Sequence, residues 1–572
     1  MNQAEKYIAD VVEGRIVTGE DVKLAVKKHL NDLETGEERG FYFDKAHAEQ
    51  ILSLCGLFKY AKGADKGKPF VLADYHAFLT YVAFGWKRRK DGLRKYNKIY
   101  HKIARKGAKT EYLALIANIL LFFGGQPTAE AWWGATKRDQ AKIGLRRQMA
   151  MAKMLISSSP YMAENWRVSQ TRIFNKDGDA FADALGKDSD TEDGWSPYAG
   201  LIDEYHAHPN NDIVNILESG MGAYGDAMLW IITTAGLNAA KSPPCLEFEQ
   251  LCKQILRGIV VNEDIFPLIF DLDAGDDWND KNVWGKANPL IGITPTWRFM
   301  ESRYEKAKIA GMSAETDFKA KNLNIWVNAE ETWIPDEIWT NCRVDFSPED
   351  LIGKKAIGGL DLASVRDMTG FGLVFPDAFE VGRDVVLVWY WVPEDLIEER
   401  ESQGKDLPSY RQWVRDGLLL TTPGNVLDYS APRAKIKELR NIYDFDTIQY
   451  DRWGAYSVII DLEADGFKVN RFGQGTVSMN PAMKEFERRV YGKKDKDDPM
   501  RLLQHNGHPI LRWNVANLIA LRDPAGNMKP DRSNVKNKID GAVCVIMGLG
   551  GLLNEEPAPG PSKYESEELT VV

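Results

Sequence analysis

The 572-residue sequence predicts an α/β protein with two successive domains, each built around a β-sheet, the first of them mainly parallel. Apolar runs of strand length alternate with amphipathic helices between residues 68 and 237, and strong β runs resume near residue 356. The length supports this division, because a single domain typically holds about 150 residues. A content of 44% hydrophobic and 27% charged residues is that of a globular protein and excludes disordered and fibrous chains.

The composition also sets the expected compartment and partners. The five cysteines form no CxxC pair, which argues against a disulfide framework or a zinc ribbon. The N-terminus carries no apolar signal core, and the most apolar helical run, 112–123, is shorter than the roughly 20 residues of a membrane span. We therefore expect an intracellular protein without membrane contact. The net charge of −10 argues against nucleic acid, but residues 86–109 hold eleven Lys or Arg and one acid, either as a solvated face or as a surface for phosphates.

Composition shifts and turn signals predict six segments along the chain. They are a helical N-terminal segment (1–60), an α/β core (61–237), a helical lid or linker (238–328), a connector (329–355), a second α/β domain (356–553) and a mobile acidic tail (554–572). Within the first segment, Asp44 is expected to cap a helix that runs to Cys55.

The segment 103–110, with the sequence IARKGAKT, joins a predicted strand (99–103) to a predicted helix (110–123). Such a loop turns backbone N–H groups and a helix N-terminus toward phosphate oxygens. Lys109 would reach the β- and γ-phosphates of ATP, and the Thr110 hydroxyl would hold Mg²⁺. The remaining predicted nucleotide-binding residues are Arg105, Lys106, Gly107 and Ala108. Because Ala108 stands where the pattern GxxxxGK[ST] has glycine, a basic helix start is the alternative interpretation.

Two more predicted strands end in polar residues. The strand 198–202 leads into Asp203, which would bind Mg²⁺ through water, and Glu204, which would position the attacking water. The strand 228–233 ends in Thr233 and Thr234, where a sensor of the γ-phosphate would lie. Either pair alone is compatible with a solvated loop. The three features in this order predict a P-loop ATPase domain of the ASCE type with a parallel central sheet.

Three separated aspartates mark the second domain. Asp361 lies inside an apolar strand, Asp451 ends a later strand, and Asp540 begins an apolar helix, where the helix dipole favours an anion. A buried carboxylate is costly unless it is paired or binds a metal. Each aspartate alone fits a helix cap or a surface acid. Their order predicts an RNase H-like α/β nuclease domain in which the three hold two divalent ions about 4 Å apart.

Two further motifs carry a structural interpretation. His505 and His508 have no acid or cysteine at ligand spacing nearby, which favours a turn over a metal site. The glycine-rich run 547–551 follows an apolar helix and is interpreted as the C-terminal stop of that helix.

From about residue 68 to residue 550 the sequence resembles the large terminase subunit of tailed bacteriophages, the motor that packages viral DNA. The segments that carry the resemblance are ARKGAKT (104–110), ATKRDQA (135–141), LIDEYH (201–206), IITTAG (231–236), WxKANP (284–289), LNIW (323–326) and KIDG (538–541). The resemblance implies ATP-driven translocation of double-stranded viral DNA into a procapsid. It also implies metal-dependent endonucleolytic cleavage of concatemeric DNA.

The resemblance implies partners and further site residues. The expected cofactors are ATP with one Mg²⁺ ion, and two Mg²⁺ or Mn²⁺ ions at the nuclease site. The expected partners are double-stranded DNA, the portal protein of the procapsid and a small terminase subunit, with a homo-oligomeric ring on the portal and a monomer in solution left open. The expected location is the host cytoplasm and transiently the portal vertex, not the mature virion.

Members of this family often carry an aromatic-Gln pair before the phosphate loop for adenine contact. The matching positions read Asp74-Tyr75-His76, which makes His76 the candidate for adenine recognition. Arg105 within the loop, or Arg138 supplied to a neighbouring subunit, would stabilise the γ-phosphate during transfer. Two alternatives stay open at this point. One is a DNA helicase or translocase whose C-terminal domain binds DNA without cleaving it, and the other is a catalytically inactive assembly factor that docks on the portal.

Overall fold

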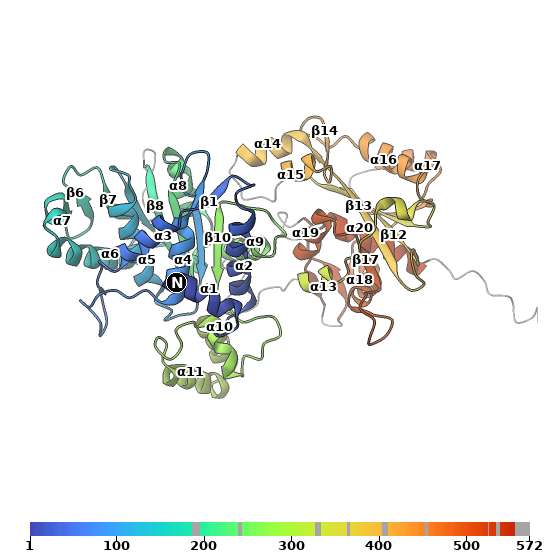
Figure 1. The fold of residues 1–572 in the computed structure, drawn as a ribbon. Coiled ribbons are helices and arrows are strands. Elements are labelled where there is room, and N and C mark those ends of the chain that lie inside the picture. Colours follow the sequence, from blue (N-terminus) through green and yellow to red (C-terminus); the bar gives the residue numbers. More distant parts are fainter. Residues whose placement is uncertain are drawn as a thin grey trace, which may run out of the picture. The chain divides into compact units, whose positions relative to one another are not determined.

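The computed structural model describes residues 1–185, 195–237, 243–326, 333–362, 367–402, 410–451, 456–523, 526–532 and 538–554. The chain divides into two compact units, Met1–Ala329 and Glu330–Val572 (Figure 1). Each unit has its own β-sheet covered by helices. Among the described helices, none is long and apolar enough to cross a membrane.

An eight-stranded sheet forms the middle of the first unit, in the order β10-β3-β9-β8-β4-β7-β6-β5. Its strands are β3 (Lys98–Lys102), β4 (Glu130–Gly134), β5 (Trp166–Val168), β6 (Ile173–Asn175), β7 (Phe181–Leu185), β8 (Pro197–Asp203), β9 (Met228–Thr233) and β10 (Ile265–Ile269). The strands from β10 to β7 run parallel, and β6 and β5 are antiparallel additions at one edge. Because β9 separates β3 from β8, the sheet has the strand order expected of an ASCE-type ATPase.

Helices cover both faces of this sheet. Helices α4 (Asp74–Gly85), α5 (Lys109–Phe123) and α6 (Arg138–Ser158) lie on one face, where Tyr112 packs edge-on against Trp230. Helices α8 (Asp212–Gly220) and α9 (Pro243–Leu256) lie on the other, where Phe248 meets Tyr100. The remaining elements of this part are α1 (Gln3–Val12), α2 (Glu20–Thr35), β1 (Phe41–Phe43), α3 (Lys45–Cys55), β2 (Trp86–Arg88) and α7 (Pro160–Asn165). Asp44 caps α3 as expected, accepting a hydrogen bond from the His47 amide.

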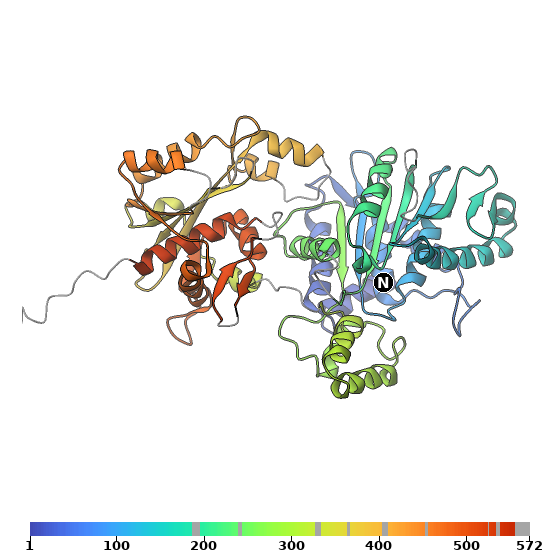
Figure 2. The same ribbon diagram turned by 180° about the vertical axis from the view of Figure 1, so that it is seen from behind.

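A small helical lobe follows the sheet and is visible from both sides in Figures 1 and 2. It consists of α10 (Trp284–Ala287), α11 (Trp297–Ile309) and α12 (Met312–Asn322), packed around the buried Trp284, Met300 and Phe318. The expectation of a helical segment over 238–328 holds for α9 and for the lobe but is wrong for residues 265–269. Strand β10 pairs in parallel with β3 and belongs to the central sheet, because its five apolar residues are buried there.

Part of the basic stretch 86–109 is internal. Four of its cations are buried and paired with acids from other elements: Arg94 with Asp226, Lys95 with Asp32 and Glu263, Lys98 with Glu218, and Lys102 with Glu249 and Asp271. Neither a solvated face nor a phosphate-binding surface describes these four side chains. Their charges neutralise buried carboxylates, which would otherwise be costly to bury.

The second unit contains a seven-stranded mixed sheet in the order β14-β13-β12-β11-β15-β16, with β17 paired to β13. Its strands are β11 (Ile357–Asp361), β12 (Thr369–Phe375), β13 (Asp384–Pro393), β14 (Leu420–Thr422), β15 (Thr447–Tyr450), β16 (Lys468–Arg471) and β17 (Leu503–His505). Strand β12 is antiparallel to β11 and β13, whereas β15 is parallel to β11 and to β16. A separate pair, β18 (Ala520–Arg522) and β19 (Met528–Pro530), is antiparallel.

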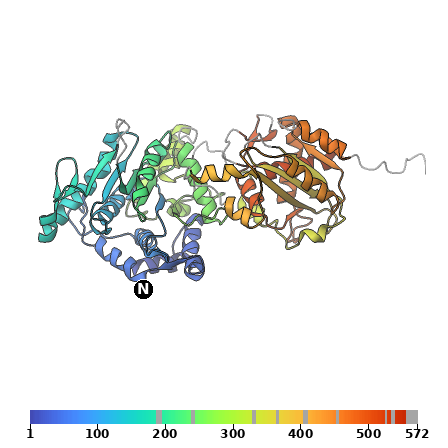
Figure 3. The ribbon, with the colours of Figure 1, turned by 90° about the horizontal axis from the view of Figure 1, so that it is seen from above.

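Side chains alternate between the two faces of this sheet. Leu360 and Phe371 point toward α16 (Ser430–Arg440) and α17 (Tyr456–Ala464), the orange helices of Figure 3. On the other face α20 (Asp540–Asn554) packs directly on the strands, and a Cβ on Gly359 would lie 2.0 Å from the Cys544 carbonyl oxygen. The other helices are α13 (Asp336–Thr340), α14 (Glu394–Ser402), α15 (Tyr410–Arg415), α18 (Thr476–Tyr491) and α19 (Pro509–Asn517).

The glycine-rich run 547–551 does not stop a helix, contrary to the prediction, and lies inside α20. A Cβ on Gly548 would lie 2.7 Å from Val374, and one on Gly550 would lie 2.5 Å from Phe472. These glycines allow α20 to approach its neighbours closely. Part of the predicted connector also belongs to the second unit, since α13 contacts α18 and α19. Of the predicted tail, residues 555–572 lie outside the described residues.

Candidate functional site

The loop between β3 and α5 has the backbone of a tight anion-binding turn. Lys106 and Ala108 have φ values of 73° and 56°, in the left-handed region that costs a non-glycine residue roughly 1–3 kcal/mol. Gly107 between them has no room for a side chain, because a Cβ would lie 2.7 Å from Ile103 Cδ1. The Tyr75 hydroxyl donates to the Gly107 carbonyl at 2.9 Å and braces the loop from α4. Strain of this kind is characteristic of functional loops.

Lys109 lies inside this loop, at the first residue of α5. Its Nζ donates to the carbonyl oxygens of Ile103 at 3.0 Å and Ala104 at 3.3 Å. Burial lowers the pKa of Lys109 below its usual value. The nearby carboxylates of Glu204 and Asp203 act in the opposite direction but do not cancel this effect. The ammonium group therefore occupies the hollow of the loop, where a phosphate would offer it stronger acceptors than two carbonyl groups do.

The loop and the end of β8 are joined by one hydrogen bond. Thr110 Oγ1 donates to Asp203 Oδ2 at 2.9 Å. Burial and the neighbouring Glu204 raise the pKa of Asp203 to about 6. The second oxygen, Oδ1, is buried and has no hydrogen-bond partner in the described part of the chain. A hydroxyl beside an unsatisfied carboxylate oxygen is the hard donor set that Mg²⁺ prefers, so these residues fit a Mg²⁺–nucleotide complex.

Glu204 follows Asp203 with a φ of 55°, which is again strained for a non-glycine residue. It begins the single turn η1 (Tyr205–Ala207), whose His206 amide donates to Thr233 Oγ1 at 2.9 Å. Thr233 and Thr234 are both buried at the end of β9. The predicted polar strand ends of β8 and β9 thus meet, and His206, which was not among the predicted site residues, lies between them.

Three other predicted nucleotide residues lie in different settings. Arg105 is exposed, and its amide donates to the Lys321 carbonyl at 2.9 Å. Arg138 is exposed at the first residue of α6. His76 is only 2% exposed and stacks on Tyr112 within the core at a centroid distance of 4.0 Å, so the structure does not support its predicted contact with adenine.

Sequence reasoning also missed how the helical lobe holds the loop. Thr294 Oγ1 donates to the Lys106 carbonyl oxygen at 2.8 Å. Asn324, fully buried with a φ of 60°, donates to the Phe270 carbonyl at 2.5 Å and accepts from the Ala235 amide at 2.8 Å. These contacts join the lobe to the loop and to the strand ends on either side of it. The segment LNIW contains Asn324, but nothing in that pattern reveals its partners.

The second unit brings its three predicted aspartates together. Strands β11 and β15 are parallel neighbours with Leu360 opposite Tyr450, so Asp361 and Asp451 follow side by side at their carboxyl ends. Gly370 lies opposite Asp361 on β12, and a Cβ on this glycine would lie 3.2 Å from the backbone of Asp540. The first turn of α20 therefore places Asp540 next to Asp361. Asp361 and Asp451 are only 3% and 8% exposed.

A cation lies among these acids. Arg532 Nη2 is 2.8 Å from Asp361 Oδ2, and its Nη1 is 3.9 Å from Asp451 Oδ2. Burial raises the pKa of Asp361. Burial and the adjacent Asp361 also raise the pKa of Asp540 to about 8. The buried Oδ2 of Asp540 has no hydrogen-bond partner among the described residues. Carboxylates with a raised pKa and an unsatisfied oxygen fit a site for divalent ions.

A fourth acid, Asp367, also lies near this cluster and was not predicted. Its charge contributes to the raised pKa of Asp540, and it pairs with Lys538 at 2.5 Å. Within the described ranges, no group of three or more His, Cys, Asp or Glu side chains is arranged to hold a metal ion. The contact between Arg532 and Asp361 provides a physical reason, because the guanidinium takes the place next to the carboxylate that an ion would need.

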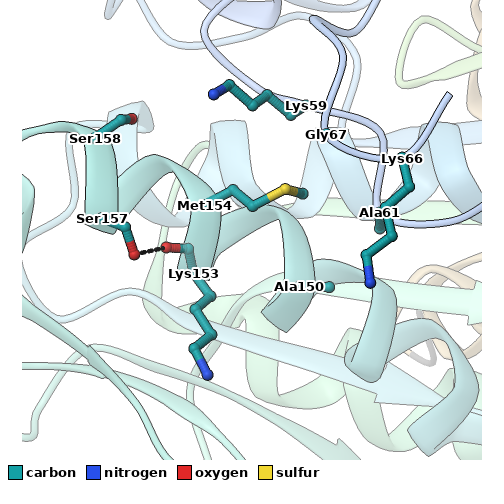
Figure 4. A pocket seen from close by; sticks show the side chains of 9 residues that line it. All are labelled: Lys59, Ala61, Lys66, Gly67, Ala150, Lys153, Met154, Ser157 and Ser158. Carbon is teal, nitrogen blue, oxygen red and sulfur yellow. Dashed lines mark hydrogen bonds between the residues drawn. The ribbon is translucent and has the colours of Figure 1, made fainter.

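His505 and a hollow beside α6 add no further site to the described part of the chain. His505 lies at the end of β17 and not in a turn, where its ring stacks on Trp339 at a centroid distance of 4.3 Å and its Nε2 is 2.9 Å from the Trp339 carbonyl oxygen. A hollow of about 570 Å³ lies between the segment 59–67 and α6. Figure 4 shows Lys59, Lys66 and Lys153 around it, with their ammonium groups spread apart. It contains none of the predicted site residues.

Comparison with known proteins identifies both units. A family model described as terminase large subunit, ATPase domain, matches residues 74–243, and one described as terminase large subunit, endonuclease domain, matches residues 260–556. Protein YmfN of Escherichia coli strain K12 is 30% identical over 459 residues, which are 79% of this chain and 93% of that protein. The large terminase subunit of Enterobacteria phage HK97 is 28% identical over 473 residues, 80% of this chain and 87% of that protein.

Among solved structures, the crystal structure of the HK97 bacteriophage large terminase covers 88% of this chain and 99% of that chain, with 25% identity and a TM-score of 0.48. The endonuclease family model begins at residue 260, before strand β10, and so extends across the helical lobe of the first unit. Together the two family models span both units. The chain belongs to the terminase large subunit family, and it is an ATPase and an endonuclease.

Proposed function

We propose that this chain uses ATP hydrolysis in its first unit to translocate double-stranded viral DNA into a procapsid, and cleaves concatemeric DNA with its second unit. The observation that carries the proposal is the hydrogen bond from Thr110 to Asp203, which joins the phosphate loop to the acidic end of a second strand. If the loop were only the start of a basic helix, no contact between Thr110 and Asp203 would be expected. The family assignment supports the same conclusion.

In the ATPase site, Lys109 would bind the β- and γ-phosphates of ATP, Thr110 would hold one Mg²⁺ ion, and Asp203 would bind this ion through water. A Mg²⁺ ion held there would supply positive charge opposite the phosphates. Glu204 would orient the attacking water, and Thr233 and Thr234 would sense the γ-phosphate. The backbone from Arg105 to Ala108 supplies N–H donors to the phosphates.

An exposed arginine completes this site. Arg105 would act within its own subunit and Arg138 on a neighbouring one, and both are exposed at the surface of the first unit. An arginine in this role stabilises the charge of the transferring phosphate, and its loss typically lowers kcat by 10³ or more. Comparing Arg105→Ala with Arg138→Ala in a phosphate-release assay decides between the two.

In the nuclease site, Asp361, Asp451 and Asp540 would hold two Mg²⁺ or Mn²⁺ ions, which would supply charge for activating a water molecule and stabilising the leaving oxygen of the phosphodiester. Arg532 would have to move away from Asp361 for ions to bind, and its guanidinium would then be available to a DNA phosphate. The convergence of these acids favours cleavage over a C-terminal domain that only binds DNA. It also argues against an inactive assembly factor.

The proposed partners are double-stranded DNA, the portal protein of the procapsid and a small terminase subunit. The chain would act as a homo-oligomeric ring on the portal vertex, in the host cytoplasm. This part rests on family membership, and the test is protection of DNA from added nuclease when procapsids, portal, ATP and this chain are combined. Protection without ATP, or none with all components, would refute packaging.

Separation of the two activities tests the site assignment. Lys109→Ala is expected to abolish phosphate release and leave metal-dependent plasmid cleavage intact, because the units carry separate sites. Asp361→Ala is expected to do the reverse. Lys59→Ala, a half-buried lysine of the same unit outside both sites, is the matched control and should change neither activity. Cleavage that survives Asp361→Ala in Mg²⁺ or Mn²⁺ would show that the nuclease centre lies elsewhere.

A further inference from the structure

We propose that His206 is a positioning residue of the ATPase, which holds the Glu204 carboxylate in place and links it to the two threonines at the end of β9. This inference rests on the proposed role of Glu204 in orienting the attacking water. It assigns a function to a residue that was not among the predicted site residues.

Three polar groups, the hydroxyls of Thr233 and Thr234 and the carboxylate of Glu204, converge on this one histidine. Its backbone amide donates to Thr233 Oγ1 at 2.9 Å. Its ring atom Nδ1 lies 3.2 Å from Thr233 Oγ1, 3.3 Å from Thr234 Oγ1 and 3.2 Å from Glu204 Oε2. The ring thus stands between the carboxylate that follows β8 and the hydroxyls that end β9. These two strands are parallel neighbours in the sheet, so their carboxyl ends open on the same edge.

The hydrogen-bond capacities of these groups restrict what the ring can do. A carboxylate only accepts hydrogen bonds, so Nδ1 must carry a proton to bond Glu204. The Thr233 hydroxyl already donates to the Thr234 carbonyl at 2.9 Å, so it too can only accept from the ring. One N–H therefore faces the Glu204 carboxylate oxygen, which has no hydrogen-bond partner among the described residues, and the Thr233 hydroxyl, which already accepts from the His206 amide. Burial lowers the pKa of His206, which keeps the imidazole neutral with a single ring N–H to share.

The same arrangement explains how Glu204 keeps its position. Its backbone is held in the left-handed region, and the carboxylate oxygen nearest His206 is buried. This oxygen has no hydrogen-bond partner among the described residues, and Nδ1 of His206 is a polar neighbour at 3.2 Å without the geometry of a formed hydrogen bond. Without the ring, the carboxylate is free to turn away from the phosphate loop. A displacement of about 1 Å at a water-orienting group can cost on the order of 10²-fold in rate.

The expected phenotype is a loss of turnover without a loss of nucleotide binding. His206→Ala should lower kcat for ATP hydrolysis by roughly 10- to 100-fold. The dissociation constant for a fluorescent ADP analogue with Mg²⁺ should stay within about twofold, because Lys109 and Thr110 keep their contacts. A general loosening of the fold would raise this constant and lower the melting temperature as well.

Two conservative variants distinguish the ring atom from the bulk of the side chain. The amide of His206→Asn can take the place of Nδ1, whereas that of His206→Gln reaches the place of Nε2. His206→Asn should therefore retain kcat within about fivefold of the original, and His206→Gln should behave like His206→Ala. Equal activity of the Asn and Gln variants would overturn the assignment to Nδ1.

The matched control is Tyr205→Phe, in the same single turn. It removes a hydroxyl that donates to Asn211 Oδ1 at 2.5 Å and has no contact with Glu204 among the described residues. This variant should keep kcat and the nucleotide dissociation constant. The link to β9 is tested by Thr234→Val alone and combined with His206→Ala. If the residues act together, the double variant loses much less than the product of the two single losses.

Glu204→Gln separates failure of this inference from failure of the proposed function. If Glu204→Gln abolishes hydrolysis and His206→Ala leaves kcat unchanged, the role of His206 is refuted and that of Glu204 stands. If Glu204→Gln itself leaves kcat unchanged, the proposed role of Glu204 is wrong, and the inference about His206 falls with it.

Discussion

Replacement of Asp540 by asparagine is expected to stabilise the second unit when no metal ion is bound. In the folded chain, burial and the charge of Asp361 raise the pKa of Asp540 from 3.8 to about 8. The ionised carboxylate is therefore unfavourable in the folded state and unhindered in the unfolded one. Asparagine has nearly the shape of the protonated acid and carries no charge, so it removes this penalty.

The sign and size follow from linkage between proton binding and folding. A raised pKa leaves stability intact below pH 3.8, and stability falls as the pH rises from there through the folded value near 8. At pH 7 the difference corresponds to at most about 4 kcal/mol, since one pKa unit equals about 1.4 kcal/mol. The side chain is only partly shielded from solvent, which lowers the expectation to about 2 kcal/mol. For a unit of this size that is a rise in melting temperature of roughly 4–8 °C.

Differential scanning calorimetry of the full chain in EDTA, at pH 4 and at pH 7.5, measures this effect. Asp540→Asn should raise the transition of the second unit at pH 7.5 and leave it nearly unchanged at pH 4. Asp465→Asn is the opposite control, because hydrogen bonds to Arg433 and Lys437 lower the pKa of Asp465 to about 2. That variant should destabilise the unit at pH 7.5. Adding Mn²⁺ should stabilise the original chain more than Asp540→Asn. If Asp540→Asn destabilises the metal-free unit at pH 7.5, the electrostatic reasoning is wrong.

Three other substitutions test separate parts of the structure. Gly359→Ala would place a Cβ 2.0 Å from the backbone of Cys544, so it should lower the stability of the second unit by about 3 kcal/mol or more and abolish plasmid cleavage, while phosphate release continues. Ala108→Gly relieves a left-handed alanine and should raise the melting temperature slightly with an unchanged KM for ATP; a loss of ATP binding would contradict this account. Lys95→Met removes one of the cations that pair with the buried Asp32, but Arg39 and Lys28 remain beside it, so the variant should lower the free energy of unfolding by about 1–3 kcal/mol in urea titrations.

Local patterns predicted the elements that present the nucleotide site. The strand expected at 99–103 is observed at Lys98–Lys102, and the helix expected at 110–123 begins one residue earlier. Both depend on hydrophobic periodicity within a short window, which the sequence displays directly. Strand β10 was missed for the opposite reason. Its five apolar residues form a strand because they pair with β3, more than 160 residues earlier in the sequence. Local periodicity contains no information about that partner.

Some contacts of the candidate sites could likewise be predicted from the sequence, and others could not. The contact between Thr110 and Asp203 and the adjacency of Asp361 and Asp451 follow from parallel strands whose ends share one edge of a sheet. Arg532 could not be predicted, because its contact with Asp361 joins residues that lie 171 positions apart in the sequence. His76 was misassigned because its place after Tyr75 suggested a base contact, whereas its position on α4 directs it into the core.

The basic stretch and the acidic nuclease centre of this sequence both contain buried charges. A basic stretch suggested a phosphate surface, yet cations such as Lys102 serve acids inside the first unit. At the nuclease centre the buried charges are carboxylates, and their mutual repulsion must be offset when no metal ion is bound. Arg532 supplies positive charge beside Asp361 and Asp451, and the raised pKa of Asp540 favours its uncharged form. Metal binding therefore competes with an internal ion pair, so an Arg532 variant should gain metal affinity in the same measurement in which the metal-free unit loses stability.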